Sequence, residues 1–226
     1  MKVSEILQLT YLIDFVNLNI LECGACHADE TMEFCSTNNC FYIEANPEDY
    51  TSLKKQNLNV SNYALTNHND VVEFTITSHD GNSSLSHSDL HREELTKHYN
   101  STFTKTLVQG ITYKNYLENI ARTNIDILVL DIEGHECTVL DTFRELTPEQ
   151  LPKIMCIEVG YDWLERKQRL FELGYVLDFY ESNNCYVSHS ACDIKKNRDS
   201  MDIINSNNRQ FIWHDKIIYT NELVVA

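Results

Sequence analysis

Basic residues are scarce in this sequence. Its 226 residues include 18 Lys and Arg against 34 Asp and Glu, which gives a formal net charge of −16. A chain of this charge repels phosphate backbones and anionic lipid surfaces unless it carries a local basic patch. Its basic clusters, Lys54-Lys55 and Lys195-Lys196 with Arg198, are too short to form such a patch. We therefore expect no nucleic-acid partner.

Long apolar runs are also absent. No window approaches the ~20 apolar residues that a transmembrane helix needs. The N-terminal segment carries Glu5 and Asp14 among its apolar positions and has no pattern typical of a signal-peptide cleavage site. We therefore expect a cytoplasmic protein without a membrane partner. With 42% hydrophobic residues, a chain of this length suits one domain with a sizeable core.

The missing signal peptide argues that the eight cysteines are reduced and do not form disulfides. Cys23-x2-Cys26 followed by Cys35 and Cys40 resembles the spacing of a four-thiolate zinc site. The expected fold, however, separates the two pairs by a helix of roughly eight residues, which is about 12 Å long at ~1.5 Å per residue. The four thiols therefore cannot converge, and we predict no zinc site.

Glycine is scarce as well, and this limits the ligands that the chain can bind. Ile20–Thr31 has the pattern of a buried strand, a tight turn at Gly24 and the polar start of a helix. A dinucleotide-binding turn needs three glycines to bring its backbone to a pyrophosphate, and Gly24 stands alone. Glu44 ends the next apolar run, roughly twenty residues later, at the usual offset of an acid that binds ribose hydroxyls. The pattern favours an adenosine ligand without phosphate, such as S-adenosylmethionine, whose sulfonium cation an acidic cleft attracts.

Three further segments accompany this turn in the order Phe41–Pro47, Asn62–Thr66 and Leu128–Glu136. Together with Ile20–Thr31 they resemble the FkbM-type family of S-adenosylmethionine-dependent methyltransferases, from about Ile20 to about Val187. The most specific part is an Asp-x-Glu-Gly-x-Glu motif, present as Asp131, Glu133, Gly134 and Glu136. The family's first loop usually reads Asp-x-Gly-Ala-Asn-x-Gly, from which Glu22, Cys26 and Ala28 depart.

The resemblance implies S-adenosylmethionine as the cofactor, bound by residues of these segments. The residues expected to contact it are Glu22, Gly24, Ala25, Glu44, Ala45, Asn46, Tyr63, Ala64 and Asp131.

Alternating strand and helix patterns predict an α/β fold with a doubly wound, mostly parallel sheet of the Rossmann type that class I methyltransferases share. We expect residues 1–226 to form a single methyltransferase-like domain. Its first part is an N-terminal helix within residues 1–18, with an apolar stripe over Val3–Val16. The central strands are Ile125–Asp131 and Ile154–Val159, and a terminal antiparallel hairpin follows.

Other segments are less regular. Val60–Ala64 is expected to be the third strand, and Val71–Ile76 a sheet edge or an appended hairpin. Residues 77–105 are interpreted as a mobile lid with one short helix around Asp89–His98, the alternative being a solvated loop. Residues 190–226 form a C-terminal extension, with a loop at Asn205–Asn208 and short strands at Phe211–Trp213 and Lys216–Tyr219.

Asp131, Glu133 and Glu158 are the candidate catalytic residues. They follow central strands at the carboxyl edge, where open α/β sheets bind ligands, so they could orient a hydroxyl or remove its proton. Glu133 and Glu136 could instead cap the following helix.

The sequence, with the resemblance, predicts an O-methyltransferase that acts on a hydroxyl of a sugar or small polyhydroxylated metabolite, so the expected partner is a small-molecule or glycan acceptor. One alternative is a metal-assisted methyltransferase in which the three carboxylates hold Mg²⁺. Another is a non-catalytic binding or scaffold protein that keeps the fold.

Overall fold

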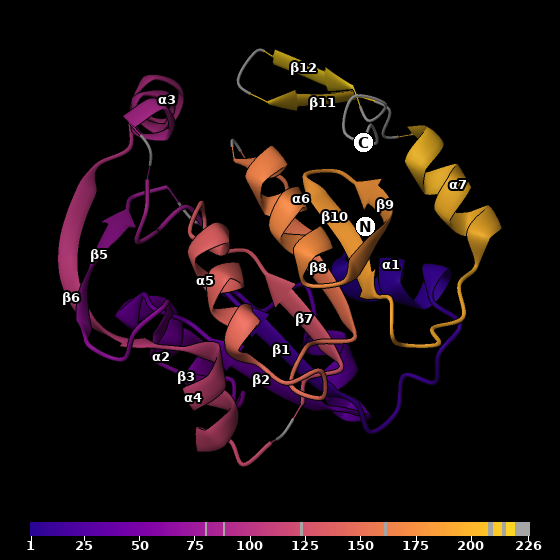
Figure 1. The fold of residues 1–226 in the computed structure, drawn as a ribbon. Coiled ribbons are helices and arrows are strands. Elements are labelled where there is room, and N and C mark those ends of the chain that lie inside the picture. The colour runs from indigo at the N-terminus through magenta and orange to yellow at the C-terminus, as the bar shows by residue number, and fades with distance from the viewer. Residues whose placement is uncertain are drawn as a thin grey trace.

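The computed structural model describes residues 1–79, 81–87, 89–122, 124–160, 162–207, 210–213 and 216–219. Its centre is a seven-stranded sheet in the order β3-β2-β1-β7-β8-β10-β9 (Figure 1). The strands are β1 (Asn19–Cys23), β2 (Asn39–Ile43), β3 (Val60–Ser61), β7 (Ile127–Leu130), β8 (Ile154–Glu158), β9 (Tyr175–Glu181) and β10 (Asn184–His189). The first five strands of this order are parallel, whereas β10 is antiparallel to both its neighbours. The predicted mostly parallel sheet with a terminal hairpin is confirmed.

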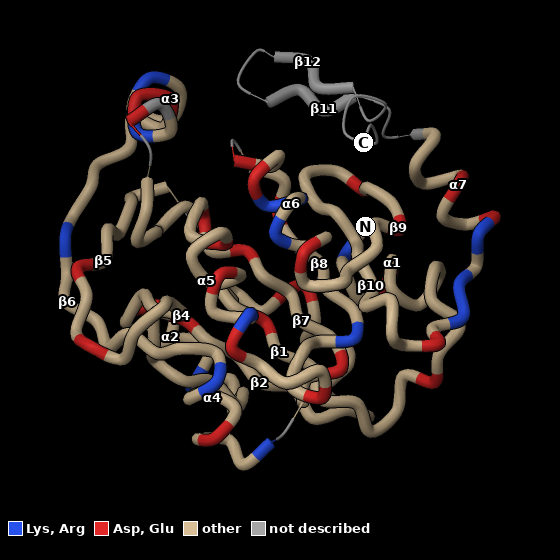
Figure 2. The backbone as a smooth tube through the Cα atoms, in the orientation of Figure 1, with Lys and Arg blue, Asp and Glu red and all other residues tan. Residues whose placement is uncertain are grey.

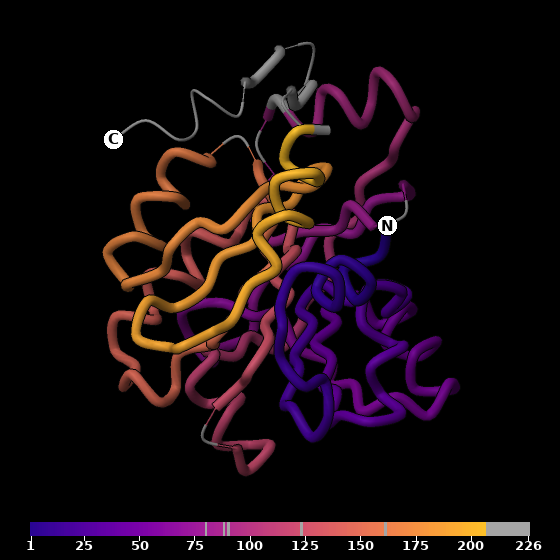
Figure 3. Tube along the Cα trace, turned by 90° about the vertical axis from the view of Figure 1, so that its right-hand side faces the viewer, coloured from indigo at the N-terminus to yellow at the C-terminus, as the bar shows by residue number. Residues whose placement is uncertain are grey.

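Helices cover both faces of this sheet. They are α1 (Val3–Thr10), η1 (Met32–Ser36), α2 (Pro47–Lys55), α4 (Tyr113–Asn119), α5 (Glu136–Thr142), η2 (Phe143–Glu145), α6 (Trp163–Glu172) and α7 (Arg198–Asn207). Side chains of α4, α5 and α6 pack on one face with Leu128 and Leu130, and those of α1, α2 and α7 pack on the other with Ile127 and Val129. Every residue of β7 is therefore buried, which explains its uninterrupted apolar run. Figure 3 shows α1, an early segment of the chain, beside α7, a late one; the two helices are in contact.

A second, three-stranded sheet extends from the side of the molecule. Its order is β4-β6-β5, built from β4 (Ala64–Leu65), β5 (Val71–Thr77) and β6 (Phe103–Ile111). The predicted strand at Val71–Ile76 is confirmed, and it forms an antiparallel pair with β6. The predicted short helix is α3 (Asp89–Tyr99), which stands at the outer end of this pair (Figure 1). Residues 103–105 of the expected lid belong to β6, because they continue its pairing with β5.

A separate hairpin lies near the end of the chain. Its strands, β11 (Gln210–Trp213) and β12 (Lys216–Tyr219), pair antiparallel at the positions predicted for short strands. Acidic positions outnumber basic ones on the described backbone (Figure 2). None of the helices in the described ranges combines the length and the apolar composition that crossing a bilayer requires.

The predicted N-terminal helix over Val3–Val16 is wrong beyond Thr10. The chain turns extended at Tyr11, which forms an isolated β-bridge with Lys196 and donates a hydrogen bond from its hydroxyl to Asp178, 2.9 Å away. Val16 is 46% exposed and lies outside the helix. Contacts with distant residues thus end a helix that the apolar spacing would continue.

Three other boundaries differ from expectation. The strand expected at Val60–Ala64 is split between β3 and β4, because Ala64 pairs with Gly110 in the second sheet. The helix of roughly eight residues expected after the Gly24 turn is the shorter 3₁₀-helix η1, which spans five residues. Asn205–Asn207 continue α7 and do not form a loop, because Met201 and Ile204 are buried at helical spacing; Asn208 lies outside the described residues.

Candidate active site

The site begins at the turn after β1. Gly24 has φ +77°, and a Cβ atom there would lie 1.7 Å from the carbonyl oxygen of Asp131. The Gly24 amide donates to the carbonyl of Ile43, 3.1 Å away, and the Asp131 amide donates to that of Cys23, also 3.1 Å away. The turn is therefore wedged between the ends of β2 and β7, and only glycine fits where the two backbones meet.

In the turn that follows Gly24, Cys26 and Ala28 also have left-handed backbones. Cys26 has φ 44° and Ala28 has φ 59°, a conformation that costs a residue with a Cβ roughly 1 to 2 kcal/mol. The Cys26 amide donates to a carboxylate oxygen of Glu44 at 2.8 Å, and the Ala28 amide donates to the carbonyl of Ala25 at 2.5 Å. These bonds hold the turn closed at two of the three positions where the sequence departs from the family's loop.

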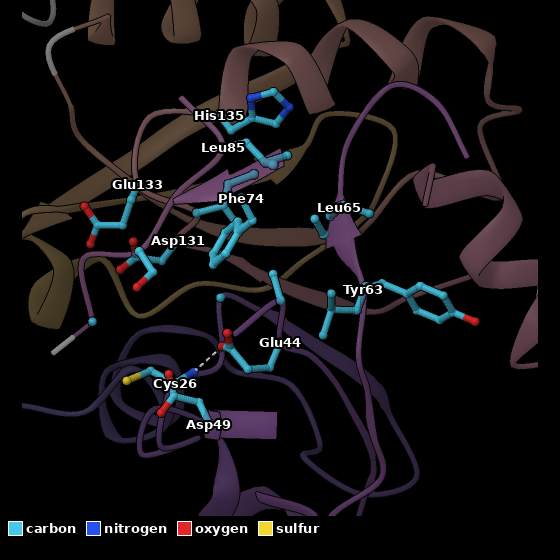
Figure 4. Close-up of a pocket in the computed structure, with 17 residues that line it drawn as sticks. Cys26, Glu44, Asp49, Tyr63, Leu65, Phe74, Leu85, Asp131, Glu133 and His135 are labelled. Atoms are coloured by element: carbon cyan, nitrogen blue, oxygen red, sulfur yellow. Dashed lines mark hydrogen bonds between the residues drawn. The ribbon is translucent and has the colours of Figure 1, made fainter. Parts of the chain in front are cut away.

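Glu44 follows β2 and faces the turn. One carboxylate oxygen accepts from the Cys26 amide and the other accepts from the Asn46 amide at 2.7 Å. Because the side chain is buried, its pKa is raised to about 7. A carboxylate has about four lone-pair sites, so each oxygen can still accept one hydrogen bond from a ligand. Figure 4 shows Glu44 directed into a pocket, with its bond to Cys26 drawn as a dashed line.

This pocket, together with the open solvent at its mouth, spans about 550 Å³. Ala45, Ala64, Leu65, Phe74 and Leu85 form its apolar wall. Its other lining residues are Gly24, Cys26, Ile43, Glu44, Asp49, Tyr63, Gly81, Ser83, Asp131, Ile132, Glu133 and His135. Six of the residues expected to contact the cofactor therefore lie together: Gly24, Glu44, Ala45, Tyr63, Ala64 and Asp131.

The three remaining expected cofactor residues lie elsewhere. Glu22 and Ala25 line a neighbouring pocket that shares Gly24, Cys26, Gly81 and Asp131 with the first one. Asn46 lines neither pocket, and its side chain caps α2 by accepting from the Glu48 amide at 3.1 Å. The ring of Tyr63 points away from the centre of the pocket (Figure 4).

Glu22 is a buried acid at the end of β1. Its side chain accepts a hydrogen bond from the Thr31 hydroxyl at 2.6 Å. Burial raises the pKa of Glu22 to about 8, and the nearby acids Glu30 and Asp131 add to this effect. Between its ordinary pKa and about pH 8, this side chain therefore prefers to stay protonated in the folded protein.

Asp131, Glu133 and Glu158 meet at the ends of β7 and β8, as predicted. One carboxylate oxygen of each lies within 4.8 Å of those of the other two. Oδ1 of Asp131 is buried without a hydrogen-bond partner, and Glu158 is 9% exposed. Burial raises the pKa of Asp131 to about 7 and that of Glu133 to about 9, and mutual repulsion adds to the shift. Figure 4 shows the carboxylates of Asp131 and Glu133 on the same side of the pocket.

The turn that carries two of these acids is held by Glu136. This buried side chain accepts from the amides of Ile132 at 2.9 Å and Gly134 at 3.1 Å, so it stabilises the turn before α5. Glu136 also pairs with Arg166, whose Nη2 lies 2.7 Å from its carboxylate. The alternative role of Glu136 as a cap of the following helix is therefore wrong, because the amides it binds precede α5, whose N-terminus has no side-chain cap. Glu133 instead has its carboxylate in the cluster and a left-handed backbone, φ 56°.

Arg166 is a residue that sequence reasoning missed. It is fully buried on α6, where its guanidinium pairs with Glu136 and Asp162 and donates to the backbone carbonyl of Glu158. The guanidinium of Arg166 thereby connects Glu136, which holds the turn after β7, to the end of β8. The sequence does contain a signal for Arg166, which is its helical spacing from Trp163 and Leu170. This spacing places Arg166 on the buried stripe of α6, where an arginine needs buried acidic partners.

The segment before α3 lies against the motif turn. The Ser84 hydroxyl donates to the carbonyl of Glu133 at 2.7 Å, and Ser86 Oγ lies 2.6 Å from His135 Nδ1. His135 Nε2 lies 3.0 Å from the hydroxyl of Thr66. Burial lowers the pKa of His135 to about 4, so the ring is neutral and bridges β4's end to this segment. Residues 81–87 therefore cover part of the pocket mouth.

A family model described as "Methyltransferase FkbM domain" matches residues 22–185. No curated protein matches the chain. Among solved structures, a precorrin-6y C5,15-methyltransferase from Geobacter metallireducens GS-15 is similar at 13% identity and a TM-score of 0.41, covering 87% of each chain. A ribosomal protein L11 methylase from Lactobacillus delbrueckii subsp. bulgaricus is similar at 8% identity and a TM-score of 0.43, covering 86% of this chain and 76% of that one.

Proposed function

The chain belongs to the FkbM family of S-adenosylmethionine-dependent methyltransferases, and from this premise we propose that it methylates a hydroxyl of a sugar or another small polyhydroxylated acceptor. The observation that carries the proposal is the carboxylate cluster of Asp131, Glu133 and Glu158 beside the pocket that contains Glu44. The pocket serves the donor and the cluster serves the acceptor.

The pocket has the features that this donor requires. S-adenosylmethionine supplies a methyl group on a positively charged sulfur. Glu44 is buried in the pocket and has acceptor capacity left on both carboxylate oxygens, which suits the two hydroxyls of a ribose. Ala45, Ala64 and Leu65 form a wall for a flat apolar ring. Asp131 lies where the two pockets join and favours a cation there.

The cluster suits a hydroxyl acceptor because a neutral hydroxyl is a weak nucleophile. In the transfer, the acceptor oxygen forms a bond to the methyl carbon, the bond from that carbon to sulfur breaks, and the sulfur leaves as a neutral thioether. The hydroxyl proton passes to a carboxylate of the cluster and then to water. Residues 81–87, which contact the turn after β7, act as a lid that excludes water from the pocket mouth in this scheme.

The proposal is tested with donor labelled in its methyl group and a panel of free sugars, glycosides and polyols. We expect labelled product with the methyl group on oxygen. Glu158→Gln and Asp131→Asn should each lower turnover by ~10²-fold, with donor affinity far less affected. Glu118→Gln, an exposed acid on α4, should match the parent and serves as the control.

Two results would contradict the proposal. One is a methyl group found on nitrogen or carbon. The other is an unchanged rate after all three carboxylates have been neutralised. Donor binding without transfer to any member of the panel would favour the rival interpretation, a binding or scaffold protein that has kept the fold.

A further inference from the structure

The carboxylate cluster has a charge that the described residues leave unbalanced. Asp131, Glu133, Glu136, Glu158 and Asp162 are five acids around one guanidinium, that of Arg166. Arg166 is committed to Glu136, to Asp162 and to the backbone carbonyl of Glu158. Within the described ranges, no side chain forms an ion pair or a hydrogen bond with the carboxylates of Asp131, Glu133 or Glu158. Buried acids without partners are costly, so something else must neutralise them.

The positions of the side chains also point to a ligand. Glu158 is nine-tenths buried and directs its carboxylate at the other two acids. Oδ1 of Asp131 is fully buried and unpartnered, although a buried carboxylate oxygen is normally hydrogen-bonded. The two acids come from different strands, so they meet through the fold and not through sequence proximity. A cation bound between the carboxylates of Asp131 and Glu158 would accept lone pairs from both of them.

The geometry is compatible with a hard divalent cation. Oxygens around Mg²⁺ lie about 2.0 to 2.1 Å from the ion, so opposite ligands are about 4 Å apart. The three oxygens all lie within 4.8 Å of one another, and neighbouring ligands of an octahedral ion are about 3 Å apart, so side-chain rotations would close the remaining gap around the ion. An all-oxygen ligand set favours Mg²⁺, Mn²⁺ or Ca²⁺ over zinc.

We infer that Asp131, Glu133 and Glu158 bind one divalent cation of the Mg²⁺ and Mn²⁺ class on the pocket side of the β7 and β8 ends. Because Asp131 and Glu133 line the donor pocket, the remaining coordination positions face the space where an acceptor must lie. Two neighbouring open coordination positions of a cation bind two adjacent hydroxyl oxygens of one molecule well. The inference therefore narrows the proposed acceptor to a vicinal diol, and only this last step rests on the proposed function.

The cation has a definite task in methyl transfer. With the carboxylates engaged as ligands, the cation takes over their role as base: bound to the reacting hydroxyl, it would stabilise the alkoxide that forms as the proton leaves directly for water, and it would orient that oxygen toward the methyl carbon. The neighbouring hydroxyl fixes the acceptor as the second ligand. An acceptor in which this neighbour is removed should therefore react at least tenfold more slowly, whereas removal of a distant hydroxyl should change the rate little.

Binding is tested on the whole protein without donor or acceptor, by titration with Mn²⁺ and measurement of the free-ion electron paramagnetic resonance signal. We expect one bound Mn²⁺ per chain, displaced by Mg²⁺. Glu158→Gln and Asp131→Asn should each weaken binding by tenfold or more. Glu118→Gln is the control, because Glu118 is an exposed acid on α4 that belongs neither to the cluster nor to the two pockets. Circular dichroism verifies that each variant is folded.

The outcomes separate this inference from the proposed function. If Mn²⁺ does not bind, or if Glu158→Gln binds it as the parent does, the cation site is wrong and protons neutralise the acids. Methyl transfer that continues in a chelator would leave the proposed function intact and overturn the cation. A cation that binds to a protein without transfer activity would support the site and contradict the function.

Discussion

Cys35 lies in an unusual environment for a partly exposed thiol. Its sulfur is 3.0 Å from the hydroxyl of Tyr42, and a hydrogen bond with the Cys40 thiol lowers the pKa of Cys35 to about 6. The same interaction, together with burial, raises the pKa of Cys40. Cys35 is therefore largely a thiolate near pH 7, and Cys40 stays protonated as the donor.

We predict that Cys35 reacts first with iodoacetamide at pH 7, as measured by peptide mass mapping. Cys40→Ala removes the hydrogen-bond donor, so the pKa of Cys35 should rise and its alkylation at pH 7 should slow roughly tenfold. Cys192 is also partly exposed and provides the internal comparison. If Cys35 reacts no faster than Cys192 in the parent protein, the hydrogen bond from Cys40 does not hold a thiolate.

Single residues differ in how well the sequence could predict their positions in the fold. Gly24 and Glu44 were predictable because a strand, a turn and a fixed offset place them at the sheet edge. The cluster of Asp131, Glu133 and Glu158 followed from the same rule, since carboxyl ends of neighbouring parallel strands meet. Arg166 was not assigned, because its partners are some 30 residues earlier in the chain or nearby on its own helix, and sequence pattern does not reveal that α5 and α6 pack together.

At the scale of elements, the turn after β1 packs closely against the end of β7. Gly24 and Gly81 have the same φ, +77°, but different surroundings. A Cβ atom on Gly24 would collide with the carbonyl of Asp131, whereas one on Gly81 would meet nothing within 4 Å. Alanine substitutions at these two glycines therefore separate the cost of a left-handed backbone, which both share, from the cost of a steric clash, which only Gly24 has.

We predict that Gly24→Ala loses donor binding and several kcal/mol of unfolding free energy, because the β1 turn must move away from β7. Gly81→Ala should cost only about 1 to 2 kcal/mol, from its left-handed backbone alone. Urea denaturation and donor titration of both variants provide the measurement. Equal losses in the two variants would show that the contact between Gly24 and Asp131 is not what fixes the turn.

Element boundaries carry a signal in the sequence where local pattern decides them, but not where distant contacts do. Asn46 and Thr112 begin α2 and α4 as side-chain caps, which is a local signal. In contrast, α1 ends at Thr10 because Tyr11 pairs with Lys196, and β3 is separated from β4 because Ala64 pairs with Gly110. Such pairings join residues far apart in the chain, so apolar periodicity carries no information about them.

The whole molecule has an excess of acid, and part of it is buried at one edge of the sheet. Burial raises the pKa of Glu22 to about 8 and that of Glu44 to about 7. Each group prefers to be protonated in the folded chain, whereas in the unfolded chain it ionises near its ordinary pKa of about 4.5. The contribution of these raised pKa values to the free energy of unfolding is fully present below the ordinary pKa of about 4.5. It is lost as the pH rises toward 7 for Glu44 and toward 8 for Glu22.

We predict that the parent protein, without donor and in a chelator, is less stable at pH 8 than at pH 5, as measured by urea denaturation. Glu22→Gln keeps the bond from Thr31 but cannot ionise, so it should lose on the order of 2 to 4 kcal/mol less over this range. Glu118→Gln, which is exposed, should follow the parent. Identical pH dependence in the parent and Glu22→Gln would contradict the assignment of this shift to Glu22.

The donor site is central to the proposed function, and we predict that the pocket between β1, β2 and β7 binds S-adenosylmethionine through Glu44. Calorimetric titration of the whole protein with S-adenosylmethionine tests it most directly. The account predicts one site per chain, and a Glu44→Ala variant that binds about 10- to 150-fold more weakly because a charged acceptor worth about 1.5 to 3 kcal/mol is lost. Glu118→Gln should bind as the parent does. No detectable binding at millimolar donor, or equal affinity in the parent and Glu44→Ala, would contradict it.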